Sequence, residues 1–264
     1  MKAGAAAVRT WPPLSARLGS VWYRHYRVYV KNLVSNGLPP FLEPLIFLAG
    51  IGLGMARYVV SMDNLPYIVF LATGLPITAA MFTAAFECSF GTFIRLEFEK
   101  VYDGMLAAPI TVNNLLMGEI LWAGSKGLFF SLAVICVESL FGVVPVPLSF
   151  AVCLVGFLTG LMFASISLFV TSLVSTINHF NFYFTGFLSP MFFFSGVVFP
   201  LANLPPFLRP IAEIFPLTHS VRMAREIARG QLTGLFAIDL GCIALFIVVM
   251  GFFAIRRLRR KLIQ

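Results

Sequence analysis

The sequence PLSFAVCLVGFLTGLMFASISLFVTSLV, residues 147–174, contains no charged side chain. A helix of about 20 mainly apolar residues is long enough to cross the roughly 30 Å hydrocarbon layer of a membrane, whereas helices in soluble domains average about 10–14 residues. This stretch therefore predicts a membrane-spanning helix.

The composition of the whole chain indicates the same class. Of 264 residues, 59% are hydrophobic and 11% are charged, whereas soluble domains carry about 25% charged residues. The 29 phenylalanines exclude a disordered chain, because disordered segments are poor in aromatic residues. The cysteines stand far apart and form no CxxC pair, so they predict neither a disulfide framework nor a metal site. They are Cys88, Cys136, Cys153 and Cys242.

Six apolar stretches predict an all-α membrane protein with six transmembrane helices. They lie at residues 38–60, 65–86, 115–141, 147–174, 180–199 and 235–255. The chain then divides into an N-terminal segment (1–37), a membrane domain (38–255) and a basic tail (256–264). Lys and Arg concentrate in segments that stay in the cytoplasm, and both ends are rich in them, so we expect both termini there. The net charge of +8 then implies contact with lipid rather than nucleic acid.

The N-terminal segment predicts an amphipathic helix over residues 14–32. One helix face carries Leu18, Val21 and His25, and an adjoining arc is basic. Such a helix lies in the headgroup layer of a membrane, although a docking surface for a partner is an alternative interpretation. We expect His25 to be packed rather than catalytic.

The sequence FIRLEFEKVYDGML, residues 93–106, predicts a short amphipathic helix on the cytoplasmic surface, ended by Pro109. At 100° per residue, the apolar positions share one face and the charged positions lie opposite. The apolar positions are Ile94, Phe98, Val101 and Met105, and the charged ones are Arg95, Glu99, Lys100 and Asp103. An exposed face with both signs of charge is most often simply solvated, but a cytoplasmic partner can also bind it.

Residues 199–230 are apolar but divided by prolines, which exclude one continuous helix. We expect short re-entrant or interfacial helices here on the outer side. The last of them should run from a Thr218 cap to Arg229 and end at Gly230. The prolines are Pro200, Pro205, Pro206, Pro210 and Pro216.

Two charged residues fall inside the third predicted span. Glu119 and Lys126 are two helical turns apart and so share one face. Ionisable groups at bilayer depth usually face a bundle interior or a polar path. Lys126 is a candidate for a polar lining, with a paired structural lysine as the alternative, and Glu119 lies near enough to the inner end to reach the interface. Glu87 lies near the end of a span, and we predict no mechanistic role for it.

Motifs of catalysis are missing from the sequence. It contains no HExxH, no GxSxG and no complete phosphate loop, because Gly124-Ser125-Lys126-Gly127 lacks the required glycine and hydroxyl. We therefore expect no enzyme activity and no cofactor on this chain.

Two longer stretches carry a family resemblance. Residues 101–123, VYDGMLAAPITVNNLLMGEILWA, and residues 189–216, SPMFFFSGVVFPLANLPPFLRPIAEIFP, continue into a PLTH sequence ending at His219. The chain resembles permeases of the type-2 ABC exporter family, and most closely the nodulation protein J branch, which exports lipo-oligosaccharides. The resemblance covers nearly the whole chain.

The resemblance implies half a transporter in the inner membrane of a bacterium. Two permease copies would pair, most simply as a homodimer, and two separate ATPase subunits would bind ATP and magnesium on the cytoplasmic face. The helix before Pro109 would be the coupling helix, residues 14–32 the interface helix, and residues 199–230 a re-entrant hairpin near the exit. The coupling contact would fall on Glu97, Glu99, Lys100 and Asp103, with the turn at Ser175 to His179 as a second contact.

Two other functions remain open from the sequence. An ion-coupled secondary transporter would use Glu119 and Lys126 as a relay. A lipid-modifying enzyme would need ionisable residues clustered at one depth, which the sequence does not indicate.

Overall fold

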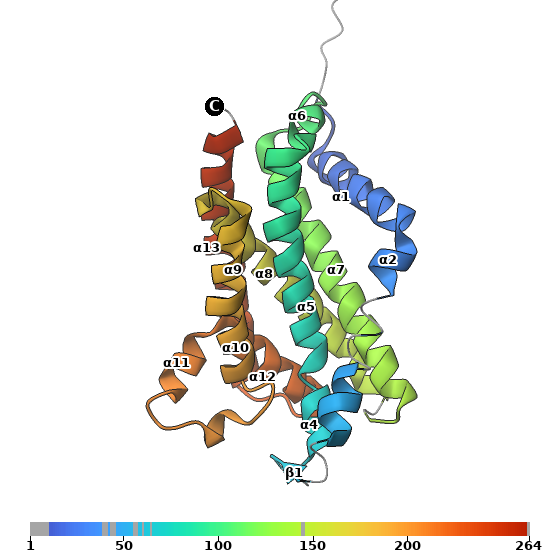
Figure 1. Ribbon diagram of the computed structural model, residues 1–264, viewed down its shortest axis with the longest axis vertical. Helices are drawn as coiled ribbons and strands as arrows, with labels where there is room; N and C mark the ends of the chain where they lie inside the picture. The colour runs from blue at the N-terminus through green and yellow to red at the C-terminus, as the bar shows by residue number, and fades with distance from the viewer. Residues whose placement is uncertain are drawn as a thin grey trace, which may run out of the picture.

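The computed structural model describes residues 11–38, 42, 46–54, 58–59, 61–63, 65–143 and 146–262. The fold is a bundle of long helices, with short helices at both ends and one two-residue hairpin, β1 (Ser61–Met62) paired antiparallel with β2 (Leu65–Pro66) (Figure 1). The N-terminal helices are α1 (Leu14–Lys31) and α2 (Leu33–Gly37), and a π-helix, η1, spans Leu48–Leu53.

Four helices in the described part of the chain are long and apolar enough to cross a membrane. The first, Tyr67–Phe98, is built from α4, α5 and two π-helical segments, η2 and η3. Their bounds are Tyr67–Ala72, Leu75–Phe86, Glu87–Gly91 and Ile94–Phe98. The others are Val112–Leu140, which is α7, Phe150–Leu173 within α8 (Val146–Leu173), and α13, Leu235–Leu262.

These four helices correspond to the spans expected at 65–86, 115–141, 147–174 and 235–255. The span expected at 38–60 lies partly outside the described residues. The one expected at 180–199 follows a 3₁₀ turn, η4 (Ile177–His179), and is helical as far as Phe194. It consists of α9 (Phe180–Tyr183), η5 (Phe184–Leu188) and α10 (Ser189–Phe194). It ends where Gly196 takes a positive φ of 83°, which glycine adopts without strain.

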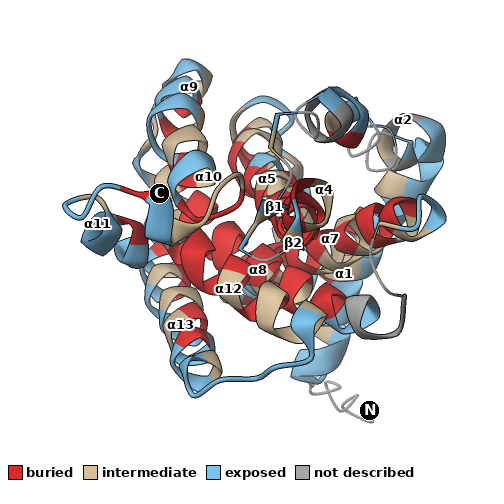
Figure 2. Ribbon diagram, turned by 90° about the horizontal axis from the view of Figure 1, so that it is seen from below, coloured by how far each residue is buried: buried red, intermediate tan, exposed pale blue. Residues whose placement is uncertain are grey.

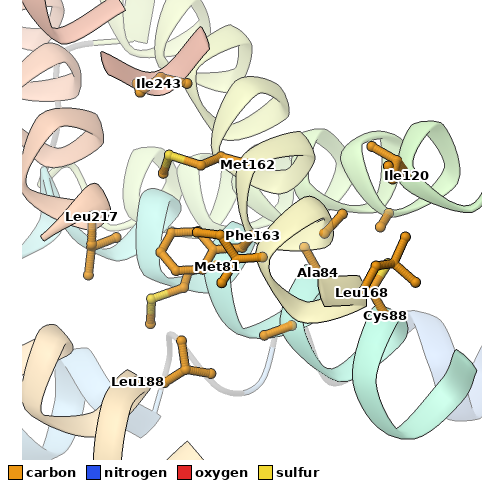
Figure 3. Close-up of a cluster of buried hydrophobic side chains, with 14 of the residues drawn as sticks. Met81, Ala84, Cys88, Ile120, Met162, Phe163, Leu168, Leu188, Leu217 and Ile243 are labelled. Carbon is orange, nitrogen blue, oxygen red and sulfur yellow. The ribbon is translucent and has the colours of Figure 1, made fainter. Parts of the chain in front are cut away.

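The core lies where α5, α7 and α8 meet. Met81, Phe163 and Leu188 are fully buried in one apolar cluster, which α12 and α13 extend with Leu217 and Ile243 (Figure 3). In Figure 2 α8 and α12 lie in the middle with many buried residues, while α9 and α13 carry exposed outer faces.

Small residues let α7 and α8 approach closely. A Cβ added to Gly127 would lie 2.9 Å from the carbonyl oxygen of Gly156, and one added to Gly160 would lie 3.0 Å from the Cα of Gly124. Between helices in a membrane, packing of this kind replaces the hydrophobic driving force that water supplies.

The segment before Pro109 differs from the single helix expected at 93–106. The long helix continues through Phe98, and Lys100 then takes a left-handed conformation with φ 52°. A separate short helix, α6 (Val101–Leu106), follows. Because π-turns place one more residue in each turn, the face after them departs from the 100° register. Phe98, expected on the apolar face, is therefore 64% exposed, and Arg95, expected on the outer charged face, is largely buried.

The proline-divided segment forms short pieces, as the sequence predicts. They are η6 (Leu201–Asn203), α11 (Arg209–Ile214) and α12 (Pro216–Arg229), and Gly230 ends α12 in the left-handed conformation. The expected cap is wrong: Thr218 lies inside the helix, and its hydroxyl donates to the carbonyl of Ala212 at 2.6 Å. Proline fixes its own φ near the helical value and needs no N–H partner, so Pro216 can begin α12 without a side-chain cap.

The two ends of the bundle are distinct. Helix α6 and the C-terminal end of α13 lie at one end of the bundle, and α11, α12 and β1 lie at the opposite end (Figure 1). Helix α1 packs on α7, where Arg17 donates to Asn114 at 3.0 Å and Trp22 to Ser125 at 3.0 Å. Asn114 closes the capping box that begins α7 beside Thr111.

Candidate functional site

A chain of buried charges joins three helical elements, and Arg95 is at its centre. One guanidinium nitrogen, Nη1, lies 2.8 Å from Oε1 of Glu87, and the other, Nη2, lies 2.7 Å from Oε2 of Glu119. Glu87 begins η2, whereas Glu119 is on α7. The arginine therefore holds the C-terminal end of the long helix Tyr67–Phe98 against α7.

Two further side chains extend this chain. His25 Nε2 on α1 lies 2.8 Å from Oε1 of Glu119, and Lys126 Nζ on α7 lies 2.8 Å from Oε2 of Glu87. We call His25, Glu87, Arg95, Glu119 and Lys126 the buried ion network. None of the five side chains is more than 15% exposed.

The sequence builds the network by local means. The π-helical segments η2 and η3 bring Arg95 and Glu87, eight residues apart, within ion-pair distance on one side of the helix. Gly118 has no side chain, so α1 docks closely: a Cβ at Gly118 would lie 2.6 Å from Val21 Cγ1. One turn after Val21, His25 then reaches Glu119. The sequence pair Gly118-Glu119 is thus the docking point of α1.

In the network the two carboxylates face the cations of Arg95 and Lys126, and Glu119 also contacts His25. A buried carboxylate or ammonium without a partner costs several kcal/mol, and removing one member of a buried pair typically costs about 3–5 kcal/mol. Ligand atoms of His25, Glu87 and Glu119 lie within 4.8 Å of one another, as a metal site requires. Both carboxylates already bind Arg95 or Lys126, so protein cations hold the positions that a metal ion would need.

This geometry changes the interpretation of the charged residues of the third span. Glu119 is fully buried and does not reach the interface, and Lys126 pairs with Glu87 and lies 5.4 Å from the ring centre of Tyr29. His25 is packed, as expected. The pairing of Glu87 with Arg95 was not predicted, because the sequence placed Glu87 at the end of a span and Arg95 on the charged face of a separate surface helix, whereas both lie on one long helix.

The four residues expected to contact an ATPase lie beside the break at Lys100. Glu99, Lys100 and Asp103 are exposed. Glu97 is partly covered, since its Oε1 lies 2.6 Å from Nζ of Lys261 near the end of α13 and its Oε2 lies 3.9 Å from Lys100. The structure thus brings the C-terminal end of α13 to this segment, which the sequence did not indicate.

A second buried charge cluster lies at the other end of the bundle. Asp239 on α13 is fully buried, with its Oδ1 2.7 Å from His219 Nδ1 and 2.6 Å from Nη2 of Arg222. Arg222 also reaches Glu213 at 2.9 Å. This cluster fastens α12, which follows the prolines, to the last long helix. The sequence singled out His219 but not Asp239, the group that holds it.

The prolines of residues 199–230 lie at or near element boundaries. Pro200 precedes η6, Pro205 and Pro206 lie in the turn between η6 and α11, and Pro216 begins α12. The arginines of α12 are paired or packed on rings: Arg229 binds Asp63, and Arg225 lies over the ring of Phe70. These arginines, which lie away from the basic termini, thus have partners within the fold.

Comparison with known proteins agrees with this architecture. The profile of the family described as ABC-2 type transporter matches residues 16–228. The chain is 33% identical over 246 residues to nodulation protein J of Sinorhizobium fredii (strain NBRC 101917 / NGR234), covering 93% of this chain and 94% of that protein. It is 32% identical over 258 residues to nodulation protein J of Rhizobium leguminosarum bv. viciae, covering 97% and 99%.

A more distant relative bears on location. The inner membrane transport permease YadH of Escherichia coli (strain K12) is 23% identical over 204 residues, covering 77% of this chain and 79% of that protein. The match to the family profile and to full-length permeases shows that the chain is a multi-pass membrane transport subunit without a catalytic domain. The chain belongs to the ABC-2 type transporter family, as a membrane permease.

Proposed function

We propose that this permease exports an amphiphilic substrate, with a lipo-oligosaccharide as the first candidate, from the cytoplasmic side of a bacterial inner membrane. Similarity to nodulation protein J over more than nine-tenths of the chain supports this cargo class. Lipid-linked glycans and hydrophobic drugs are the other amphiphiles that such a path would accept. ATP and magnesium bind two copies of a separate ATPase subunit, and both termini of the permease face that subunit.

A second copy of the chain completes the transporter in this proposal. Two exposed apolar faces support it, one on α13 and one on the helix made of α9, η5 and α10. Leu245, Val248 and Phe252 on α13 are 57–67% exposed, and Phe182 on α9 is 78% exposed. Apolar surface of this extent suits lipid or a second permease copy.

The ATPase contact is assigned to the exposed turn around Lys100. Glu99, Lys100 and Asp103 supply charges of both signs, and Phe98 supplies an exposed ring beside them. An aromatic anchor surrounded by polar groups is typical of residues that dominate a protein interface. Glu97 then acts from the edge of this contact, through Lys261.

One observation carries the coupling mechanism: Arg95, five positions before Lys100, bonds to both Glu87 and Glu119. A push on the turn therefore reaches α7 through Arg95 and α1 through Glu119 and His25. Because a buried ion pair is costly to break, the three elements move together rather than slide past one another. Closure of the ATPase subunits on ATP would change the access of the path between two permease copies in this way.

In this proposal Glu119 and Lys126 lie near the translocation path and connect the helices around it. Their burial favours a connecting function over direct contact with cargo. The outer segment, with Pro200, Pro205, Pro206, Pro216 and His219, would form the hairpin that borders the exit.

The triple variant Glu99→Ala, Lys100→Ala and Asp103→Ala tests the function. In liposomes containing the permease and its ATPase, we expect normal insertion but loss of permease-stimulated ATP hydrolysis and of ATPase capture. The matched control is Arg256→Ala, Arg259→Ala and Arg260→Ala, which removes three exposed charges from α13 at the same end of the bundle. Unchanged ATPase stimulation and transport in the first triple variant would contradict the coupling assignment.

An ion-coupled secondary transporter remains the alternative. A relay through Glu119 and Lys126 needs access to water, which their burial and pairing oppose. Substrate uptake into liposomes driven by a proton or sodium gradient, without any ATPase, would favour it.

A further inference from the structure

A cavity of about 330 Å³ lies at the end of the bundle away from α6. One wall is α12, whose residues Arg222, Arg225 and Arg229 recur at one helix face. The opposite wall is the turn after α10 together with η6, and Asp63 closes one side. A volume of this size holds the head group of an amphiphile or a small anion.

Two of the three arginines are neutralised by carboxylates. Arg222 uses its three nitrogen atoms on Asp239 and Glu213. Arg229 forms an ion pair with Asp63. Arg222 therefore has little donor capacity left for a ligand, and the charge of Arg229 is offset by Asp63.

Arg225 is different, since no carboxylate among the described residues pairs with it. Its Nε donates to Thr73 Oγ1 at 3.2 Å and its Nη2 to the carbonyl of Val197 at 3.3 Å, both long bonds to neutral acceptors. Its guanidinium lies 3.8 Å from the ring centre of Phe70. Burial, reinforced by the nearby Arg229 and only partly opposed by Asp63, lowers the pKa of Arg225 to about 9.

A second polar group in the cavity wall lacks a partner. Ser195 is 1% exposed, and within the part of the chain that the structure describes its hydroxyl makes no hydrogen bond. A buried hydroxyl without a partner costs free energy that a ligand oxygen can recover. The next residue, Gly196, lies close to Arg225, because a Cβ there would be 3.6 Å from Nη1. The residue that carries the unpaired hydroxyl is therefore next in sequence to one that lies against the guanidinium of Arg225, which reaches across from the opposite wall.

Two carboxylates line the cavity: Asp63 is paired with Arg229, and Glu226 opposes an anion. Glu226 accepts hydrogen bonds from the backbone N–H of Thr233 at 2.9 Å and from its hydroxyl at 2.5 Å. Glu226 follows Arg225 directly, and adjacent side chains on a helix point about 100° apart. The negative charge of Glu226 thus lowers the affinity of the cavity for an anion, but its carboxylate does not occupy the position beside Arg225.

We propose that this cavity binds an anionic oxygen group of the phosphate class, with Arg225 as the charged partner and the Ser195 hydroxyl as a second donor. Guanidinium groups suit phosphate oxygens, because several N–H donors lie in one plane. The group arrives either on an amphiphile, such as a lipid head group, or as a free anion from water. Binding of this kind does not depend on export or on the ATPase.

Calorimetry on the purified full chain in dodecyl maltoside tests the proposal with two probes. Dodecyl phosphate presents the anion on an amphiphile, and inorganic phosphate presents it free. Binding of dodecyl phosphate alone would identify an amphiphile as the source, and binding of both would identify the free anion as sufficient. Binding of neither probe would overturn the proposal.

Variants assign the binding to this cavity. We expect Arg225→Gln to weaken binding about tenfold or more, because a charge-assisted hydrogen bond is lost. We expect Ser195→Ala to weaken it about threefold and Glu226→Gln to tighten it about threefold, since each changes one weaker interaction. The matched control Arg257→Gln removes an exposed charge at the other end and should change nothing.

Thermal unfolding of each variant shows whether it folds. If Arg225→Gln does not fold, Ser195→Ala and Glu226→Gln decide the question, because they change binding in opposite directions. Equal affinity in all folded variants would overturn the proposal.

Discussion

Nη2 of Arg95 lies 2.7 Å from Oε2 of Glu119, and it joins the helix that leads into the exposed turn to the helix on which α1 docks. Both residues belong to segments that the sequence treats as separate, twenty-four positions apart. Movement of the exposed turn therefore has a direct route into the middle of the bundle.

Replacing Arg95 with Met should destabilise the permease by about 3–5 kcal/mol, because Glu119 keeps only His25 and Glu87 keeps only Lys126 as partners. The measurement is thermal or denaturant unfolding in detergent. In the double variant with Glu119→Gln, much of this cost should disappear, because the Glu119 carboxylate that would otherwise lack its arginine partner has been removed. Strict additivity of the two single effects would contradict the pairing.

Gly118 should accept no larger side chain while α1 stays in place. Gly118→Val would bring its Cβ to 2.6 Å from Val21, so α1 must shift and the contact between His25 and Glu119 should open. Trp22 stacks with Tyr26 and packs edge-on against Trp122, so tryptophan fluorescence should report the shift.

Gly104→Val is the control for this experiment, because a Cβ at Gly104 has no neighbouring atom within 4 Å. The companion Val21→Ala should restore part of the wild-type fluorescence. An unchanged spectrum in Gly118→Val would show that α1 does not dock there.

Asp239→Asn should loosen the opposite end of the bundle. The buried carboxylate accepts from Arg222 and contacts His219, so its loss should cost about 3–5 kcal/mol. The rate of backbone amide hydrogen exchange should be higher in α12 of the variant than in the wild type, while the rate in α1 stays unchanged. Equal protection of α12 in both proteins would refute the assignment of Asp239 as its fastening point.

The ion pair between Glu97 and Lys261 should contribute little stability. Both side chains are about one-third exposed, and pairs of this kind contribute about 0–1 kcal/mol. The Glu97→Gln variant should therefore have the same free energy of unfolding as the wild type. The change nevertheless removes the ion pair that holds the end of α13. A cysteine introduced at Gln264 would be labelled with a thiol reagent in both proteins. Faster labelling in the Glu97→Gln variant would detect the release, and Arg257→Gln is the control.

The long apolar helices can be predicted from the sequence, because the apolar stretches are longer than the helices of typical soluble domains. The amphipathic helix at residues 14–32 and the C-terminal stop of α12 at Gly230 are likewise predicted, since both depend on local chemistry. The π-turns at Glu87–Gly91 and Ile94–Phe98 are not, because apolar periodicity carries no sign of an extra residue per turn.

That local deviation explains most of what the sequence missed at the site. It turns Arg95 inward and Phe98 outward, and it separates α6 from the long helix at Lys100. Asp239 was missed for another reason: a single carboxylate near the start of an apolar stretch resembles an interfacial residue until its partners on α12 are known.

The contact between Lys261 and Glu97 has a practical meaning for handling the protein. A purification tag or fluorescent protein fused close behind Lys261 would begin near the turn at Lys100, where it would compete with any partner for space. The end of α13 is therefore better left free of fusion partners.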